Sequence, residues 1–441
     1  MRKLERRAWI CIFLALFLFL GTCVFVFRFV RDGGDWATFT GNLRLYSNGY
    51  LAVGKITDRN GTVLANNTSK GIKYNSDAET RKATIHAVGD KAGNISTGAE
   101  NAFADKIVGY NVVTGIYGAE SEDNEIRLSI DADLCKVAYE ALGSYNGTVG
   151  VYNYKTGEIV CMVSKPSFDP KDPPSAKSAE SGTFINKFLS GTFTPGSIFK
   201  TVTAAAAIDH YAGIDSFHYT CYGSRTLYGE KINCAEAHGS MDFNGALAKS
   251  CNGAFSIIAQ KVGAKTLREY TRNAGLTTAY DIDGIHNAKG TFQFPSNEDF
   301  NLAWAGIGQW KDQVNPCSMM VYMGAVANGG TSVVPKVLDS GSSRGKKTDR
   351  MLKTSTANRL KRMMRNDVTS EYGQSSFPGL QLYAKTGTAE QSGKQPNAWF
   401  AGFLGSDHPY AFVVLVEDSG SGITYAGPVA NKVLQALVKK Y

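Results

Sequence analysis

The chain has 441 residues, of which 43% are hydrophobic and 20% are charged. This is the composition of a globular protein, and the length supports about two to three domains. The formal net charge of +8 has no nucleic-acid-binding motif beside it, so we read it as ordinary surface charge and expect no nucleic-acid partner.

The N-terminus predicts a membrane anchor. Residues 1–7 form a basic tail, and residues 8–27 are a run without a charged side chain. A run of about 20 apolar residues can cross a bilayer. No small-x-small cleavage pattern follows it. We therefore expect an uncleaved, single-pass anchor in membrane lipid, with the basic tail in the cytoplasm and the rest of the chain outside.

The rest of the chain divides by pattern into two parts. Residues 28–124 are expected to form a linker and a small pedestal domain without chemistry of its own. Residues 125–441 are expected to form an α/β domain of the α+β type, in which helices cover an antiparallel sheet. The expected strands are a hairpin at 148–163, the segment before Lys385, and 398–404 and 410–417; the expected helices include 316–328 and 428–439. The Lys-Thr-Gly sequence at 155–157 is predicted to be the hairpin turn.

The first candidate for chemistry is a serine followed three residues later by a lysine. Ser197 follows a proline–glycine turn and precedes an alanine-rich segment that predicts a buried helix. Ser197 and Lys200 would then project from one helix face. Burial lowers the pKa of a lysine, which can then act as a base toward a serine hydroxyl. The same spacing at Ser343 and Lys346 lies in a polar, Gly/Ser-rich stretch that predicts a solvated loop.

The second candidate is the pair Ser250 and Asn252, which follows a predicted helix. A serine and an asparagine two residues apart can share a hydrogen-bond network, in which the serine relays a proton and the asparagine orients a lysine. The alternative is a polar helix end, with Asn252 and Gly253 as its terminator.

The third candidate is Lys385-Thr386-Gly387-Thr388, which ends a strand-like segment. The lysine supplies positive charge, the threonines supply hydroxyls, and Gly387 would let a substrate backbone approach closely. Each of the three patterns occurs often by chance. Their order and spacing together predict a serine acyl-transfer site.

Eight cysteines occur in the chain. Cys221 and Cys234 flank a polar stretch expected outside the cytoplasm, so a disulfide between them is one interpretation. Cys251 is expected to be buried beside the Ser250 motif. Because C-x-x-C spacing is absent, the sequence predicts no zinc site. The cysteines expected in the core are Cys135, Cys161 and Cys317.

The three motifs in this order resemble those of penicillin-binding proteins and serine β-lactamases. Residues 54–65 resemble the N-terminal signature of class B penicillin-binding proteins. Residues 156–170 and 399–403 resemble parts of the transpeptidase domain of the same family. The resemblance runs from about Gly54 to the C-terminus.

This resemblance implies a D,D-transpeptidase that cross-links peptidoglycan stem peptides and is acylated by β-lactam antibiotics. It implies no metal and no organic cofactor, and it implies a SEDS-type glycosyltransferase as partner. The roles that it implies are nucleophile for Ser197, base for Lys200, proton relay for Ser250 with Lys385, positioning for Asn252, and carboxylate binding for Thr386 and Thr388, beside Gly387.

Three alternatives remain open. A D,D-carboxypeptidase would use the same acylation with water as the acceptor. A serine β-lactamase would also deacylate with water, but the nearest E-x-x-L-N pattern, at 298–302, has its last two letters reversed. A catalytically silent cell-wall scaffold would keep the fold without the reaction.

Overall fold

The computed structural model of the protein describes residues 2–38, 46–47, 50–51, 53–68, 70–111, 113, 116–117, 124–296, 299–339, 341 and 345–441. Part of the expected linker, Glu298 of the lactamase-like pattern, and Ser343 of the alternative Ser-x-x-Lys pattern lie outside these residues.

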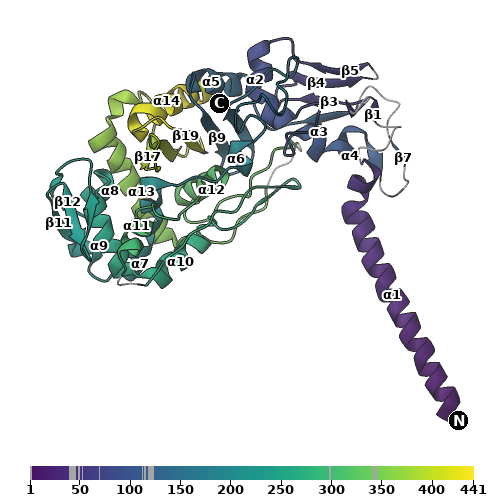
Figure 1. The fold of residues 1–441 in the computed structure, drawn as a ribbon, viewed down its shortest axis with the longest axis horizontal. Helices are drawn as coiled ribbons and strands as arrows, with labels where there is room; N and C mark the ends of the chain where they lie inside the picture. Colours follow the sequence, from purple (N-terminus) through teal and green to yellow (C-terminus); the bar gives the residue numbers. More distant parts are fainter. Residues whose placement is uncertain are drawn as a thin grey trace.

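Helix α1 (Arg2–Ala37) projects away from the rest of the molecule (Figure 1). Within the described residues it is the one helix that is long and apolar enough to cross a membrane, and its apolar window is exposed. The helix is longer than the uncharged run at 8–27, and it contacts the short helix α4 (Ala104–Ile107). Such a helix fits the expected anchor by length and composition.

The region after α1 contains a four-stranded sheet in the order β5-β4-β3-β8. Strand β8 pairs in parallel with β3, so the expected domain boundary at residue 125 falls on a strand of this sheet, and the domain limits stay predictions. The elements of the region are β1 (Tyr46–Ser47), β2 (Tyr50–Leu51), β3 (Lys55–Thr57), β4 (Val63–Thr68), β5 (Gly71–Tyr74), α2 (Ala78–Val88), α3 (Ala99–Ala102), β6 (Tyr110–Asn111), β7 (Ile116–Tyr117) and β8 (Glu125–Arg127).

The centre of the molecule is a five-stranded antiparallel sheet in the order β10-β9-β19-β18-β17. Helices α5 and α14 lie on one side of this sheet and α12 on the other (Figure 1). Every residue of β18 and β19 is buried, because helices cover both faces. The expected antiparallel sheet covered by helices is therefore confirmed. The elements are α5 (Ala132–Leu142), β9 (Gly147–Asn153), β10 (Ile159–Lys165), α12 (Pro316–Ala327), β17 (Leu382–Ala389), β18 (Asn397–Leu404), β19 (Tyr410–Val416) and α14 (Gly422–Lys440).

The Lys-Thr-Gly sequence at 155–157 lies in the turn between β9 and β10, as the sequence predicts. Gly157 has a φ of +85° there, a conformation that glycine adopts without steric cost.

A second, largely helical layer packs beyond the sheet. Its alanine-rich helix α7 is almost entirely buried, because small side chains let α9 and α10 approach it closely. The elements of this layer and its surroundings are α6 (Lys187–Ser190), the 3-10 turn η1 (Gly196–Phe199), α7 (Lys200–His210), β11 (His218–Cys221), β12 (Ser224–Leu227), β13 (Glu230–Asn233), β14 (Gly239–Asp242), α8 (Phe243–Ala248), α9 (Asn252–Val262), α10 (Ala264–Asn273), β15 (Asp281–Ile282), β16 (Ile285–His286), α11 (Phe300–Gly306) and α13 (Thr354–Asp367).

The closing helix differs from its expected start at Pro428. Helix α14 begins at Gly422, and Pro428 lies inside it. A proline there costs one backbone hydrogen bond. The first turn is held against the sheet nonetheless: a Cβ on Gly422 would lie 2.5 Å from the carbonyl oxygens of Gly387 and Trp399. Packing against the sheet therefore outweighs the tendency of proline to interrupt a helix.

Asp131 connects the pedestal region, α5 and the C-terminus. Its buried carboxylate accepts hydrogen bonds from the Leu134 N–H (3.0 Å), Asn60 Nδ2 (3.1 Å) and the Tyr441 hydroxyl (2.6 Å), and it pairs with Lys440 Nζ at 2.6 Å. Burial raises the pKa of Asp131, but the four hydrogen-bond donors together outweigh it, with Lys440 the strongest, and the pKa lies below its ordinary value.

We predict that Asp131→Ala destabilises the folded chain by about 2 kcal/mol or more, because it removes an N-cap and takes away the acceptor of the Asn60 and Tyr441 hydrogen bonds. Asp133→Ala is the matched control. Asp133 also contacts Lys440, at 3.1 Å, but its side chain is 86% exposed. Thermal unfolding followed by circular dichroism would compare the two. Equal effects of the two substitutions would contradict the role given to Asp131.

Candidate active site

Five residues of the three motifs line one cavity of about 480 Å³: Ser197, Ser250, Asn252, Thr386 and Thr388. They come from η1, from the junction between α8 and α9, and from strand β17. A larger cavity of about 700 Å³, around Arg272 and Lys346, contains no residue of these motifs. The chemistry expected from the sequence is therefore assembled in the smaller cavity.

Two glycines bring β17 against the turn that carries Ser197. Gly196 has a φ of +57°, and a Cβ there would lie 2.7 Å from the Thr388 carbonyl oxygen. A Cβ on Gly387 would lie 2.9 Å from the Pro195 carbonyl oxygen. Gly387 thus permits a close approach of the protein's own turn, whereas the sequence suggested an approach of substrate.

Lys200 stands at the start of α7, completely buried, with its amine among uncharged oxygens. Its Nζ lies 3.0 Å from Ser197 Oγ, 2.6 Å and 3.2 Å from the carbonyl oxygen and Oγ of Ser250, and 2.6 Å from Asn252 Oδ1. An ammonium has three N–H donors for these four oxygens. A neutral amine could instead donate twice and accept the hydroxyl proton of Ser197.

Burial, and after it the positive charge of Lys385, lower the pKa of Lys200 to about 7, although Cys251 and Cys234 act in the opposite direction. A substantial fraction of the amine is therefore neutral near pH 7, which is the state that a base requires.

The Ser250 motif joins two helices. Helix α8 ends at Ala248, Ser250 has a φ of +51°, and α9 begins at Asn252 with Cys251 as its N-cap. The alternative in which Asn252 and Gly253 terminate a helix is wrong, because they open the next one. Asn252 uses its whole amide: Oδ1 accepts from Lys200, and Nδ2 donates to the Asn233 carbonyl oxygen at 2.7 Å.

Lys385 is also fully buried and is not among the residues that line the cavity. Its Nζ contacts the Thr386 carbonyl oxygen at 3.2 Å and the Tyr372 hydroxyl at 3.4 Å. Burial lowers the pKa of Lys385, and the nearby carboxyl of Asp367 opposes that shift. Lys385 acts on Lys200 electrostatically, because its positive charge lowers the pKa of the Lys200 amine.

Two residues near the motifs were not predicted from the sequence. Tyr372 lies in a π-helical turn (Val368–Tyr372) after α13. Its hydroxyl accepts from the Thr386 N–H and lies 3.1 Å from Thr386 Oγ1. The carboxyl of Asp367 is buried and has no hydrogen-bond partner among the described residues. Burial raises the pKa of Asp367. Neither residue belongs to a short motif, so no local pattern could have singled it out.

The disulfide suggested between Cys221 and Cys234 is not formed in the structure, where both are free thiols. Cys234 Sγ lies 3.8 Å from Cys251 Sγ. The sulfur atoms of Cys221, Cys234 and Cys251 therefore lie together as one group. Cys251 is buried beside the site, as expected, and Cys135, Cys161 and Cys317 are buried.

Comparison with known proteins agrees with the geometry. Residues 147–437 match the family model of the penicillin-binding protein transpeptidase domain. The chain is similar to the peptidoglycan D,D-transpeptidase PbpA of Mycobacterium tuberculosis, with 25% identity over 377 residues, 76% of each chain. It is also similar in fold to a D,D-transpeptidase domain of a peptidoglycan glycosyltransferase from Eggerthella lenta, with a TM-score of 0.74, 23% identity, and coverage of 88% of this chain and 98% of that one.

A second solved structure with this fold is penicillin-binding protein A of M. tuberculosis as an imipenem acyl-enzyme complex. The TM-score is 0.76 at 22% identity, over 88% of this chain and 98% of that one. The family model covers more than half of the chain. The motif serines and asparagine line one cavity, and the Lys200 amine contacts Ser197 and Asn252 there. The chain therefore belongs to the penicillin-binding protein transpeptidase family, in the class B group.

We predict that acylation by a fluorescent penicillin accelerates as the pH rises from about 6 to 8, with a midpoint near the pKa of about 7. Below that pKa the Lys200 amine is protonated and cannot accept the serine proton. Lys200→Arg should abolish this rising limb, because a guanidinium stays protonated. Stopped-flow or gel-based acylation rates at each pH would measure both, with circular dichroism as a check on folding. A Lys200→Arg variant that acylates normally would remove lysine from the role of base.

Proposed function

We propose that this protein is a peptidoglycan D,D-transpeptidase that works through an acyl-enzyme on Ser197 and is inhibited by β-lactams. The observation that carries the proposal is the contact of one buried, partly neutral amine, that of Lys200, with Ser197, Ser250 and Asn252. A serine hydroxyl needs such a base to become a nucleophile at neutral pH.

In the first half-reaction, Ser197 Oγ attacks the carbonyl between two terminal D-alanines of a stem peptide while its proton passes to Lys200. The developing oxyanion is stabilised by the backbone N–H groups of Ser197 and Thr388. The tetrahedral intermediate then collapses, the amide C–N bond breaks, and a proton relayed from Lys200 through Ser250 goes to the departing nitrogen. The products are D-alanine and an ester on Ser197. Lys385 contributes positive charge near this relay.

In the second half-reaction, the amine of a neighbouring stem peptide attacks the ester. Its proton returns by the same relay to Ser197, which is released as the new peptide bond forms. Strand β17 is the end strand of the sheet, and an extended peptide can add to such an edge. Thr386 and Thr388 line the cavity at this strand and would bind the terminal carboxylate of the donor stem.

The location follows from the reaction. Helix α1 would anchor the protein in the cell membrane of a bacterium, with the catalytic domain outside, where peptidoglycan is cross-linked. The partner that fits this arrangement is a SEDS-type glycosyltransferase, which supplies the glycan strand whose stem peptides are joined. It would contact the anchor and the pedestal region.

We predict that a fluorescent penicillin forms one stable ester on the full-length protein in detergent, and that Ser197→Ala abolishes the adduct. Peptide mapping of the labelled protein would locate the ester on Ser197. Ser175→Ala is a suitable control, because Ser175 is part of a surface turn away from the cavity. With uncross-linked peptidoglycan strands as substrate, D-alanine release should be matched by new cross-links.

The other outcomes separate the alternatives. An adduct that turns over within seconds indicates a β-lactamase. Release of D-alanine without cross-links indicates a carboxypeptidase. A folded protein that forms no adduct indicates a scaffold, and contradicts the proposed reaction.

A further inference from the structure

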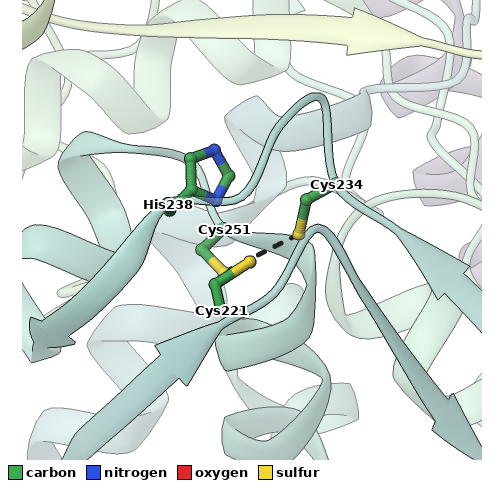
Figure 2. A group of neighbouring side chains, drawn as sticks. All are labelled: Cys221, Cys234, His238 and Cys251. Carbon is green, nitrogen blue, oxygen red and sulfur yellow. Dashed lines mark hydrogen bonds between the residues drawn. The ribbon is translucent and has the colours of Figure 1, made fainter.

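Four side chains meet beside the cavity, from separate segments of the stretch between Cys221 and Cys251 (Figure 2). Cys221 ends β11, Cys234 follows β13, His238 precedes β14, and Cys251 is the N-cap of α9. Their sulfur and ring-nitrogen atoms all lie within 4.8 Å of one another. Cys221 and Cys251 are buried, and Cys234 and His238 are half-buried.

The dimensions of this group are those of a tetrahedral metal site. Thiolates bound to one zinc ion at about 2.3 Å lie about 3.8 Å apart. The sulfur atoms of Cys234 and Cys251 are 3.8 Å apart. Three sulfur ligands and one imidazole are a closed set that is typical of structural zinc and too soft for magnesium or calcium.

The surroundings supply the interactions that bound thiolates require. The Gly253 N–H points to Cys234 Sγ at 3.4 Å, and the Ala254 N–H points to Cys251 Sγ at 3.4 Å. Both donors belong to the first turn of α9, where the helix dipole also favours negative charge. His238 Nδ1 is buried and has no hydrogen-bond partner within the described part of the chain. A metal ion bound there would satisfy it.

We propose that Cys221, Cys234, His238 and Cys251 bind one Zn²⁺ ion as a structural site. Binding releases the three thiol protons and leaves three thiolates and a neutral imidazole on the metal. The proposal replaces two expectations from the sequence, the Cys221–Cys234 disulfide and the absence of zinc. The spacing criterion failed because these ligands come from three separate segments, and only Cys234 and His238 are close in sequence.

The site would position catalytic groups. Cys251 stands between Ser250 and Asn252, and Asn252 Nδ2 is bound to the carbonyl of Asn233, the neighbour of Cys234. Cys234 and His238 line the same cavity as Ser197. A metal ion here would connect the β11–β14 ribbon to the start of α9. It would thereby fix the backbone beside Asn233 and Asn252, and with it the amide that contacts Lys200. It would not touch the substrate.

We predict that the full-length protein, purified in detergent without chelators or nickel, contains about one zinc per chain by elemental analysis. After chelation and addition of Co²⁺, thiolate-to-cobalt charge-transfer absorption should appear. Cys234→Ala and His238→Ala should lose the zinc. Cys317→Ala is the matched control, because Cys317 is a buried free cysteine of α12, outside the group. Loss of the metal should slow acylation by fluorescent penicillin about tenfold or more.

The metal content is measured independently of acylation, so it tests this site even if the proposed reaction fails. Wild-type protein that stays well below one equivalent after addition of Zn²⁺ would overturn the proposal. So would a disulfide within the group, seen by intact mass and peptide mapping, or a folded Cys234→Ala variant that keeps its zinc. If the variants do not fold, alkylation of the wild-type protein decides: Zn²⁺ should protect Cys221, Cys234 and Cys251, and equal labelling with and without the ion contradicts the site.

Discussion

The site depends on a lysine amine that is buried and that contacts no charged partner among the residues the structure describes. Lys200 is held by the hydroxyl of Ser197, by Ser250 and by the amide oxygen of Asn252. Burying an ammonium among neutral groups is unfavourable, so the pKa falls and the neutral amine becomes accessible near pH 7. The same burial that lowers the pKa of Lys200 leaves the amine dependent on its oxygen partners. Any segment that displaces one of them changes both its position and its pKa.

Three separate parts of the chain must therefore be held in fixed positions relative to one another. The helix start at Lys200 is fixed by the packing of α7 against α9 and α10. Strand β17 is held against the turn of Ser197 by two glycines, Gly196 and Gly387, whose missing side chains leave room for backbone carbonyls. The oxygens of the Ser250 motif are set by the junction of α8 and α9, where Ser250 adopts a left-handed conformation. Each constraint fixes the position of a backbone segment, so the motif side chains are held on helices and a strand of the domain.

The junction between α8 and α9 packs against small ribbons rather than the central sheet. It contacts the two ribbons β11–β14 and β12–β13, which are small and partly exposed. The proposed zinc site lies where the ribbons meet the start of α9, and a bound ion would hold this junction in place. In that view the lysine depends on two kinds of support, a packed helical core under α7 and a metal-bound ribbon beyond Asn252.

The sequence by itself determined the local features of this protein. Alternation and apolar runs predicted the central strands, and the alanine-rich segment predicted α7. Motif order singled out Ser197, Lys200, Ser250, Asn252 and residues 385–388. Of these, five line one cavity, and Lys200 contacts Ser197, Ser250 and Asn252. Tertiary structure decided what depends on distant neighbours. It set the start of α14 at Gly422, added Tyr372 and Asp367 beside Lys385, and gathered Cys221, Cys234, His238 and Cys251 at one point. The physical reason is that periodicity and turn chemistry are short-range, whereas burial, close backbone contacts and a tetrahedral ligand set exist only once separate segments have packed together.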